Sequence, residues 1–227
     1  MPEFDRYAEE YDKLLQDPIR DRFAPGSDFF FERKWLLLKE YMLTARLEPR
    51  TASWLDVGCG RGELLQKGAG AFSEVCGCDV SPEMLNAPHG LNVVVQEDPT
   101  RLPYPDRKFD LVTAVCVYHH VVPTDRPGLT AEIVRVLRPG GIACIIEHNP
   151  FNPVTRLIVS RTPVDADAQL LRAGTSEGLF TSAGLQNPET TYFLYFPEKL
   201  YRRLSSVEAA LAWLPMGGQY ASFARKP

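Results

Sequence analysis

The sequence lacks the features of membrane-spanning and secreted proteins. It has no apolar run near the roughly 18 residues needed to span a bilayer. Residues 1–6 lack the basic and apolar regions of a signal peptide. With a formal net charge of -4, the chain also offers no general electrostatic attraction to nucleic acid or anionic lipid. We therefore expect a cytoplasmic protein with no membrane span and no nucleic-acid partner.

Metal-binding patterns are also missing. No two pairs of cysteine or histidine have the spacing of a zinc site, and only four histidines are present. Most of the cysteines lie in or beside apolar strand-like runs, where a thiol behaves as a small hydrophobic side chain. We therefore expect reduced thiols and no metal ion. The cysteines are Cys59, Cys76, Cys78, Cys116 and Cys144.

What is present indicates one α/β domain over residues 1–227. An apolar content of 44% in a chain of this length is enough to form a full core. Short runs rich in Val, Ile, Leu and Cys alternate with stretches long enough for helices, which is typical of parallel strands covered by helices. The runs that predict strands are 53–57, 74–78, 92–95, 110–117 and 142–147.

Helix boundaries and a last unit can also be predicted. Ser81 before Pro82 is typical of a helix start. Residues 135–141 have basic side chains followed by Pro and Gly, which is typical of a helix end. Near the C-terminus, strand-like runs at 191–196 and 219–224 flank leucines at helical spacing. We expect the sheet to end in this strand, helix, strand unit.

A glycine-rich loop follows the first predicted strand. Residues 56–62 contain Gly58, Gly60 and Gly62 and lead into a helical pattern. Glycine there lets a ligand lie close to the backbone between a strand and a helix. A dinucleotide-binding loop instead has its third glycine three residues after the second and binds pyrophosphate. Glycine at every second residue behind the acidic Asp56 suits a ligand with a cationic amino-acid end.

Acidic residues also follow the next two predicted strands. Asp79 ends the second strand, where a carboxylate can accept both hydroxyls of a ribose. Asp98 follows the third strand, where it can accept a hydrogen bond from an adenine amine. Because parallel strands end at the same edge of a sheet, we expect Gly60, Asp79 and Asp98 to border one cavity.

Five blocks taken together resemble class I S-adenosylmethionine-dependent methyltransferases of the small-molecule, type 11-like group. They occur in the family's order over roughly residues 50–150, and they are residues 56–62, 79–85, 102–110, 119–120 and 135–141. The resemblance implies a Rossmann-like, doubly wound, mostly parallel sheet of seven strands with an antiparallel last strand. It also implies S-adenosylmethionine as the cofactor.

The same resemblance implies a set of cofactor-binding residues. The glycine loop would hold the methionine end, Asp79 the ribose, and the segments after the second and third strands the adenine. Arg33 could meet the cofactor carboxylate, although a solvated position is the alternative. The set is Tyr11, Asp56, Gly58, Cys59, Gly60, Gly62, Asp79, Val80, Met84, Asp98, Pro99, Cys116 and Val117. Two features depart from the family: residues 86–90 shorten its usual second helix, and Pro99 cannot donate a backbone hydrogen bond.

Three histidines are candidates for a general base. His119 and His120 follow the fourth predicted strand and His148 follows the fifth, so all three lie at carboxyl ends that face the crevice. Histidine titrates nearest the working pH, and a base is needed if the acceptor is a hydroxyl or an acidic carbon. Adjacent side chains point in different directions, so we rank His119 and His148 above His120.

The remaining segments complete the single domain. Residues 1–48, with helical patterns at 4–15 and 30–43, form a predicted helical cap, and residues 50–150 form the cofactor-binding core. By resemblance, residues 149–172 form the substrate cap, although an amphipathic helix packed on the sheet is the alternative. Residues 173–227 complete the sheet. The apolar and aromatic content of the substrate cap indicates a hydrophobic or ring-bearing acceptor.

Three functions are compatible with these patterns. The leading hypothesis is transfer of a methyl group from S-adenosylmethionine to O, N or C of a small molecule by in-line displacement. The second is a sensor or partner-binding module that binds the cofactor without catalysis. The third, a nicotinamide-dependent oxidoreductase, requires a dinucleotide-type loop that the sequence lacks.

Overall fold

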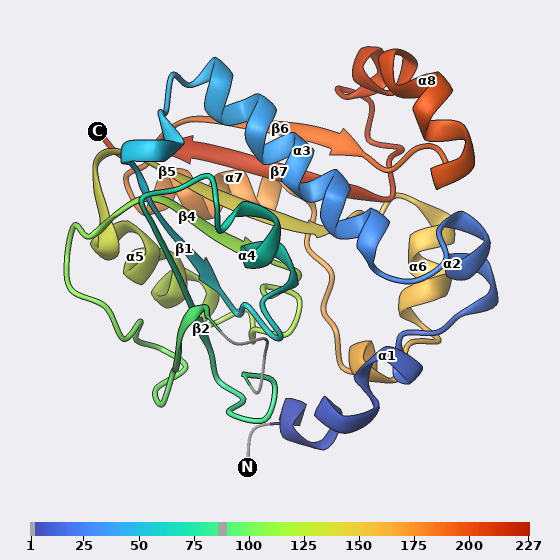
Figure 1. Cartoon of the computed structure of the whole chain (residues 1–227), viewed down its shortest axis with the longest axis horizontal. Coiled ribbons are helices and arrows are strands. Elements are labelled where there is room, and N and C mark those ends of the chain that lie inside the picture. Colours follow the sequence, from blue (N-terminus) through green and yellow to red (C-terminus); the bar gives the residue numbers. More distant parts are fainter. Residues whose placement is uncertain (1–2, 86–89) are drawn as a thin grey trace.

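The computed structural model, which describes residues 3–85 and 90–227, contains a seven-stranded sheet of order β3-β2-β1-β4-β5-β7-β6 (Figure 1). Strands β1 to β5 are parallel, and β7 is antiparallel to both β5 and β6. The predicted mostly parallel sheet with an antiparallel last strand is therefore confirmed. The strands are β1 Ser53–Val57, β2 Glu74–Asp79, β3 Asn92–Val95, β4 Phe109–Val115, β5 Leu137–His148, β6 Gln186–Phe193 and β7 Gln219–Arg225.

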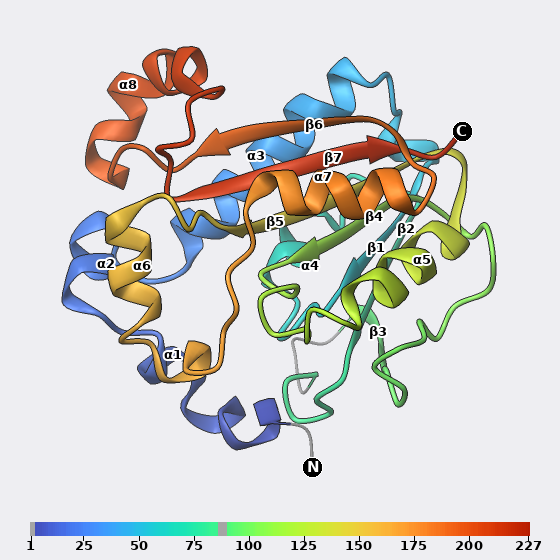
Figure 2. The ribbon, with the colours of Figure 1, turned by 180° about the vertical axis from the view of Figure 1, so that it is seen from behind.

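Helices cover both faces of the sheet, because each face is apolar. Helices α3 (Asp28–Thr44) and α4 (Glu63–Gly68) pack on one face, and α5 (Arg126–Val136) and α7 (Ala173–Ser182) on the other (Figures 1 and 2). The first layer buries Trp35, Leu38, Leu64 and Leu65 against Trp54, Leu111 and Cys144. The second buries Leu129, Ile133 and Phe180 against Val112 and Ile145.

Short elements gather beyond the carboxyl ends of the parallel strands. Both views show α2 (Pro18–Phe23) beside α6 (Pro153–Val159), with α1 (Tyr11–Leu14) below them. Helix α1 contacts the 3-10 turn η4 (Pro163–Asp165). Helix α8 (Glu198–Leu211) stands away from the sheet, beyond β6 and β7. Among the described residues, no helix combines the length and apolar character that crossing a bilayer requires.

The predicted helix at residues 4–15 was wrong, whereas a predicted helix end later in the chain was right. Residues 4–15 form the short turns η1 (Glu3–Arg6) and η2 (Ala8–Glu10) before α1, because their aromatic side chains pack on different neighbours, as Phe4 does on His120. The predicted helix end at residues 135–141 is confirmed: α5 ends at Val136 with Arg135 in its last turn, and β5 begins at Leu137. Within β5, Gly140 donates its backbone N–H to the carbonyl of Lys226.

Two further differences concern the start of elements. Ser81 does begin a turn, with its Oγ 3.2 Å from the N–H of Met84, but 82–85 is a turn and not a helix. The proposed shortening of a helix at residues 86–90 falls mostly on 86–89, outside the described residues. Strand β6 begins at Gln186, five residues before the predicted start at 191.

Candidate functional site

A cavity of about 1290 Å³ lies at the edge of the sheet where β1 to β5 end. Segment 149–172 also lines it, through residues of α6 and η4. All three predicted histidines line it, as do most of the predicted cofactor-binding residues: Tyr11, Asp56, Gly58, Cys59, Gly60, Asp79, Val80, Met84, Pro99, Cys116 and Val117. Gly62 and Asp98 do not. The fold therefore brings nearly all of the predicted residues to one place.

The glycine loop turns the chain from β1 into α4 at the cavity wall. Gly58 has φ +66°, and a Cβ on it would lie 2.5 Å from Cγ2 of Val117, so only glycine fits there. Gly62, with φ +74°, is the residue before α4, where a Cβ would lie 2.6 Å from Cδ1 of Leu91. Gly62 lies outside the cavity, so its position does not support the predicted contact with a ligand. Glycine is required at this position because of the left-handed turn and the nearby side chain of Leu91.

Gly58→Ala is expected to destabilise the protein by about 2–4 kcal/mol, because it combines a strained left-handed backbone with a clash in a packed region. Urea denaturation would measure the loss. Gly70→Ala is the matched control, because an added Cβ there meets nothing within 4 Å and its backbone is not left-handed. Equal stabilities of the two variants would contradict this description of the loop.

Asp79 connects the glycine loop to the end of β2. Its Oδ2 accepts the N–H of Gly60 at 2.8 Å, and its Oδ1 accepts the N–H of Ser81 at 2.9 Å. Burial raises the pKa of this carboxyl, although the backbone N–H groups of Ser81, Gly60 and Val80 act in the opposite direction. The backbone N–H groups do not use all the lone pairs of the two oxygens, so the carboxylate can still accept hydroxyl donors from the cavity.

Asp56 is a buried carboxylate on the cavity wall. It is only 3% exposed, and its Oδ1 accepts a hydrogen bond of 2.6 Å from the hydroxyl of Thr113, which in turn accepts from the indole of Trp54 at 2.9 Å. Burial raises the pKa of Asp56 to about 7, despite the lowering effects of Thr113 and Lys34. The negative charge of ionised Asp56 is therefore poorly compensated in the ligand-free protein, and a cationic group of a ligand would stabilise it.

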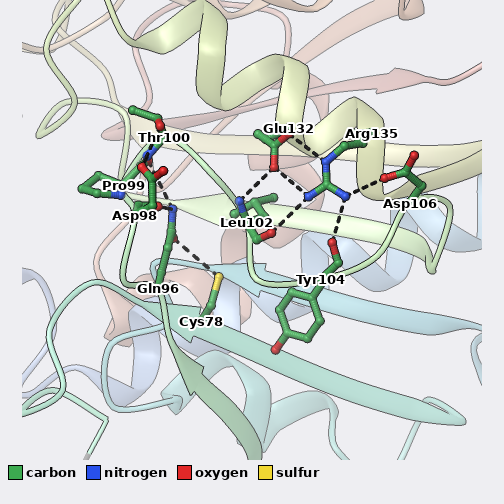
Figure 3. A network of polar contacts seen from close by, with 10 residues as sticks. All are labelled: Cys78, Gln96, Asp98, Pro99, Thr100, Leu102, Tyr104, Asp106, Glu132 and Arg135. Atoms are coloured by element: carbon green, nitrogen blue, oxygen red, sulfur yellow. Dashed lines mark hydrogen bonds and ion pairs between the residues drawn. The ribbon is translucent and has the colours of Figure 1, made fainter.

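Asp98 is the one predicted acid that turns away from the cavity. Its Oδ1 accepts the backbone N–H and the hydroxyl of Thr100 at 2.8 and 2.6 Å, and its side chain is exposed (Figure 3). The expectation that Asp98 borders the cavity with Gly60 and Asp79 was therefore wrong, because the turn after β3 uses its carboxylate. Gln96, Pro99 and Thr100 line the cavity instead.

The motif residues around Arg135 have a structural role. The guanidinium of Arg135 bonds Glu132 and Asp106 at 2.7 Å and donates to the carbonyls of Leu102 and Tyr104 (Figure 3). These contacts fix segment 102–106 on α5. The blocks at 102–110 and 135–141 therefore position the strands that carry the cavity, and Arg135 itself does not line it.

Cys116 lies just after β4 in a polar corner of the cavity. Its Sγ is 3.9 Å from Nζ of Lys34 and 3.6 Å from Nε2 of Gln219, and His148 lies beside it. Burial alone would raise the pKa of the thiol, but Lys34 and His148 outweigh it and lower the pKa to about 7. The backbone of Cys116 is left-handed, with φ +57°, which re-aims the chain after the strand.

His119 is held between two carboxylates. Its Nδ1 lies 2.5 Å from Oε2 of Glu147, whose Oε1 accepts the N–H of Tyr118 at 2.7 Å. Its Nε2 lies 3.4 Å from Oδ1 of Asp165, and Nε2 of His120 lies 3.5 Å from the same oxygen. Burial alone would lower the pKa of His119, but Glu147 and Asp165 raise it well above its usual value. Nδ1 of His119 is thus bonded to Glu147, and its Nε2 faces Asp165 at ion-pair distance.

One further candidate from the sequence lies outside the site, and two residues that line it were not identified as site residues from the sequence. Arg33, the candidate for the cofactor carboxylate, is buried against Glu208 and Tyr201 of α8 and does not line the cavity. Its neighbour Lys34 does line it. Asp165 lies within the segment predicted as the substrate cap, but nothing in its spacing links it to His119 and His120, which precede it by about 45 residues.

Comparisons with known proteins agree with this geometry. A family model described as "Methyltransferase domain" matches residues 55–145. The chain is 31% identical over 186 residues to a ubiquinone biosynthesis O-methyltransferase of Xanthomonas axonopodis pv. citri, covering 74% of this chain and 76% of that protein. It is 28% identical over 160 residues to a tRNA (carboxymethyluridine(34)-5-O)-methyltransferase of Arabidopsis thaliana, covering 69% of this chain but only 38% of that protein.

A solved structure shares the fold. The crystal structure of a SAM-dependent methyltransferase from Archaeoglobus fulgidus superposes with a TM-score of 0.63 at 21% identity, covering 87% of this chain and 99% of that chain. The likeness covers most of both chains, so it concerns the fold as a whole.

Proposed function

Because the chain belongs to the class I S-adenosylmethionine-dependent methyltransferases, we propose that it transfers a methyl group from S-adenosylmethionine to a hydroxyl oxygen of an apolar, ring-bearing small molecule. The observation that carries this proposal is one cavity lined by two buried carboxylates, Asp56 and Asp79, and by three histidines. Its 1290 Å³ exceed the roughly 300–1,000 Å³ of a single-ligand pocket, which leaves room for cofactor and acceptor together.

The residues of the cavity fit the chemistry of this cofactor. Asp56 would accept the cofactor's ammonium group, and Lys34, on the same wall, would meet its carboxylate. Asp79 would accept the ribose hydroxyls with its remaining lone pairs. Val80, Met84 and Pro99 would pack against the adenine. When bound, S-adenosylmethionine supplies the methyl group, and the electron pair of its broken sulfur–carbon bond stays on sulfur.

The acceptor side of the cavity is apolar. Aromatic and aliphatic side chains from α2, α3, α6 and η4 line it, among them Phe23, Phe30, Val154, Ile158 and Val164. Such a wall favours a ring with an apolar substituent over a polar sugar or a nucleic acid. The relative named as a ubiquinone biosynthesis O-methyltransferase supports a hydroxyl on such a ring as the acceptor.

His148 is the residue we propose as the general base. Nδ1 of His119 is bonded to Glu147, and Nε2 of both His119 and His120 faces the carboxylate of Asp165. His148 faces no carboxylate among the contacts of the described residues: its Nδ1 lies 3.4 Å from the amide of Gln219, and Cys116 lies beside it. His148 would take the proton of the acceptor hydroxyl as the oxygen bonds to the methyl carbon.

Methyl transfer can be tested with tritium-labelled S-adenosylmethionine and a prenylated dihydroxybenzene, with tRNA as a parallel substrate. We expect label in the ring compound and none in tRNA. His148→Gln is expected to lower the rate by roughly 10²–10⁴-fold and to leave cofactor affinity unchanged. Cofactor binding without transfer to any ring compound would favour a sensor or binding module, and label in tRNA would overturn the acceptor class.

A further inference from the structure

We propose that His119, His120 and Asp165 bind one divalent transition-metal ion, of the Zn²⁺ or Co²⁺ type, on the wall of the cavity. This goes against the expectation of no metal ion, which rested on sequence spacing alone. The two histidines come from the turn after β4 and the aspartate from η4, so only the fold brings them together.

The ligand atoms have the separation that such an ion needs. One nitrogen of each histidine and one carboxylate oxygen all lie within 4.8 Å of one another. Oδ1 of Asp165 lies 3.4 Å from Nε2 of His119 and 3.5 Å from Nε2 of His120, and both distances exceed the usual range of hydrogen bonds. Metal–ligand bonds of about 2.0–2.1 Å in a tetrahedron place neighbouring ligand atoms about 3.3 Å apart. The two nitrogen–oxygen separations are thus already close to coordination geometry, and the two histidine nitrogens lie within 4.8 Å of each other.

The surroundings fix the ligands in the orientation that coordination requires. Glu147 is bonded to Nδ1 of His119, which directs Nε2 of that ring toward Asp165. A carboxylate on the far nitrogen of a metal-binding histidine is the usual supporting contact. The segment that carries Asp165 is tied to the histidine turn as well, because the N–H of Gln169 donates to the carbonyl of His119 at 2.7 Å.

The site is open toward the cavity. All three ligands line it, and their side chains range from buried to 21% exposed. Three protein ligands with an open position are typical of catalytic metal sites, whereas structural sites are closed by a fourth. On the proposed function, the free position would hold the acceptor hydroxyl and ease loss of its proton to His148, whose ring centre lies 5.2 Å from that of His119.

Binding can be measured without the reaction. The full chain, stripped of metal with a chelator, is titrated with Co²⁺ by visible absorption and with Zn²⁺ by calorimetry. We expect one ion per chain. The visible absorption bands should be those of Co²⁺ coordinated by nitrogen and oxygen atoms. Asp165→Asn should weaken binding at least about tenfold. Asp167→Asn, an exposed acid in the same segment, should bind as the wild type does.

Thermal unfolding of both variants shows whether each is folded. Absence of a Co²⁺ spectrum in the folded wild type, or equal affinities of the wild type and a folded Asp165→Asn, would overturn the site and leave a cluster held by ion pairs alone. S-adenosylmethionine binding to the metal-free protein is measured separately. It depends on Asp56 and Asp79, so its loss would refute the proposed function, and a failure of Co²⁺ binding would not.

Discussion

Asp79→Asn is expected to weaken S-adenosylmethionine binding about 100-fold. The substitution keeps the size of the side chain but replaces one acceptor oxygen by a donor and removes the charge. Asp79 already accepts from Gly60 and Ser81, so the new NH₂ group would face either a backbone N–H or the ribose hydroxyls. Loss of hydrogen bonds to a charged group costs about 1.5–3 kcal/mol each. Calorimetric titration of the folded variant would measure the change.

Asp98→Asn is the matched control for this experiment. Asp98 has the same chemistry and follows the neighbouring strand, but its carboxylate bonds Thr100 and lies outside the cavity. Its affinity for the cofactor should stay within about twofold of the wild type, since surface changes of this kind are worth less than about 0.5 kcal/mol. A loss of equal size in both variants, or no loss in Asp79→Asn, would mean that the ribose is held elsewhere.

Asp56→Asn is expected to stabilise the ligand-free protein at pH 8 by roughly 2–4 kcal/mol while weakening cofactor binding. Burial raises the pKa of Asp56 to about 7, so the folded protein holds this proton more tightly than the unfolded chain does. The stability that the proton provides is fully present below about pH 4 and is lost as the pH rises to about 7. Asparagine has no such proton to lose.

Urea denaturation at pH 5 and pH 8 tests this difference. The wild type should lose more stability between the two values than Asp56→Asn does. The charged groups that act on Asp56 are Lys34, Asp79 and Glu63, and they are retained in the variant. Asp167→Asn, an exposed site, serves as the control and should follow the wild type. Parallel pH profiles of the wild type and Asp56→Asn would contradict the burial of a poorly compensated charge.

Much of the fold and half of the site follow from local patterns. Asp56 and Asp79 could be placed because they end buried strands, and parallel strands end at one edge of a sheet. Gly58 could be recognised because glycine recurs at every second residue of the loop, between a predicted strand and a predicted helix. Asp98 could not be placed, although it also follows a strand, since the turn to Thr100 decides where its carboxylate points.

The remaining residues depend on tertiary placement. Arg33 and Lys34 are adjacent on α3, and only the rotation of that helix on the sheet decides which one meets the cavity. Glu147 was visible as a strand residue, but its contact with His119 arises from the pairing of β4 and β5. Asp165 reaches the histidines only because η4 folds back over them. Spacing rules for metal sites therefore give no signal here.

The central claim is that Asp56, Asp79 and the glycine loop form a binding site for one adenosyl cofactor. Isothermal titration of the purified chain with S-adenosylmethionine and with S-adenosylhomocysteine tests it most directly. We predict that each ligand binds once per chain and that the two compete for the same site. A folded chain that releases no heat with either ligand, and whose melting temperature neither one shifts, would contradict it.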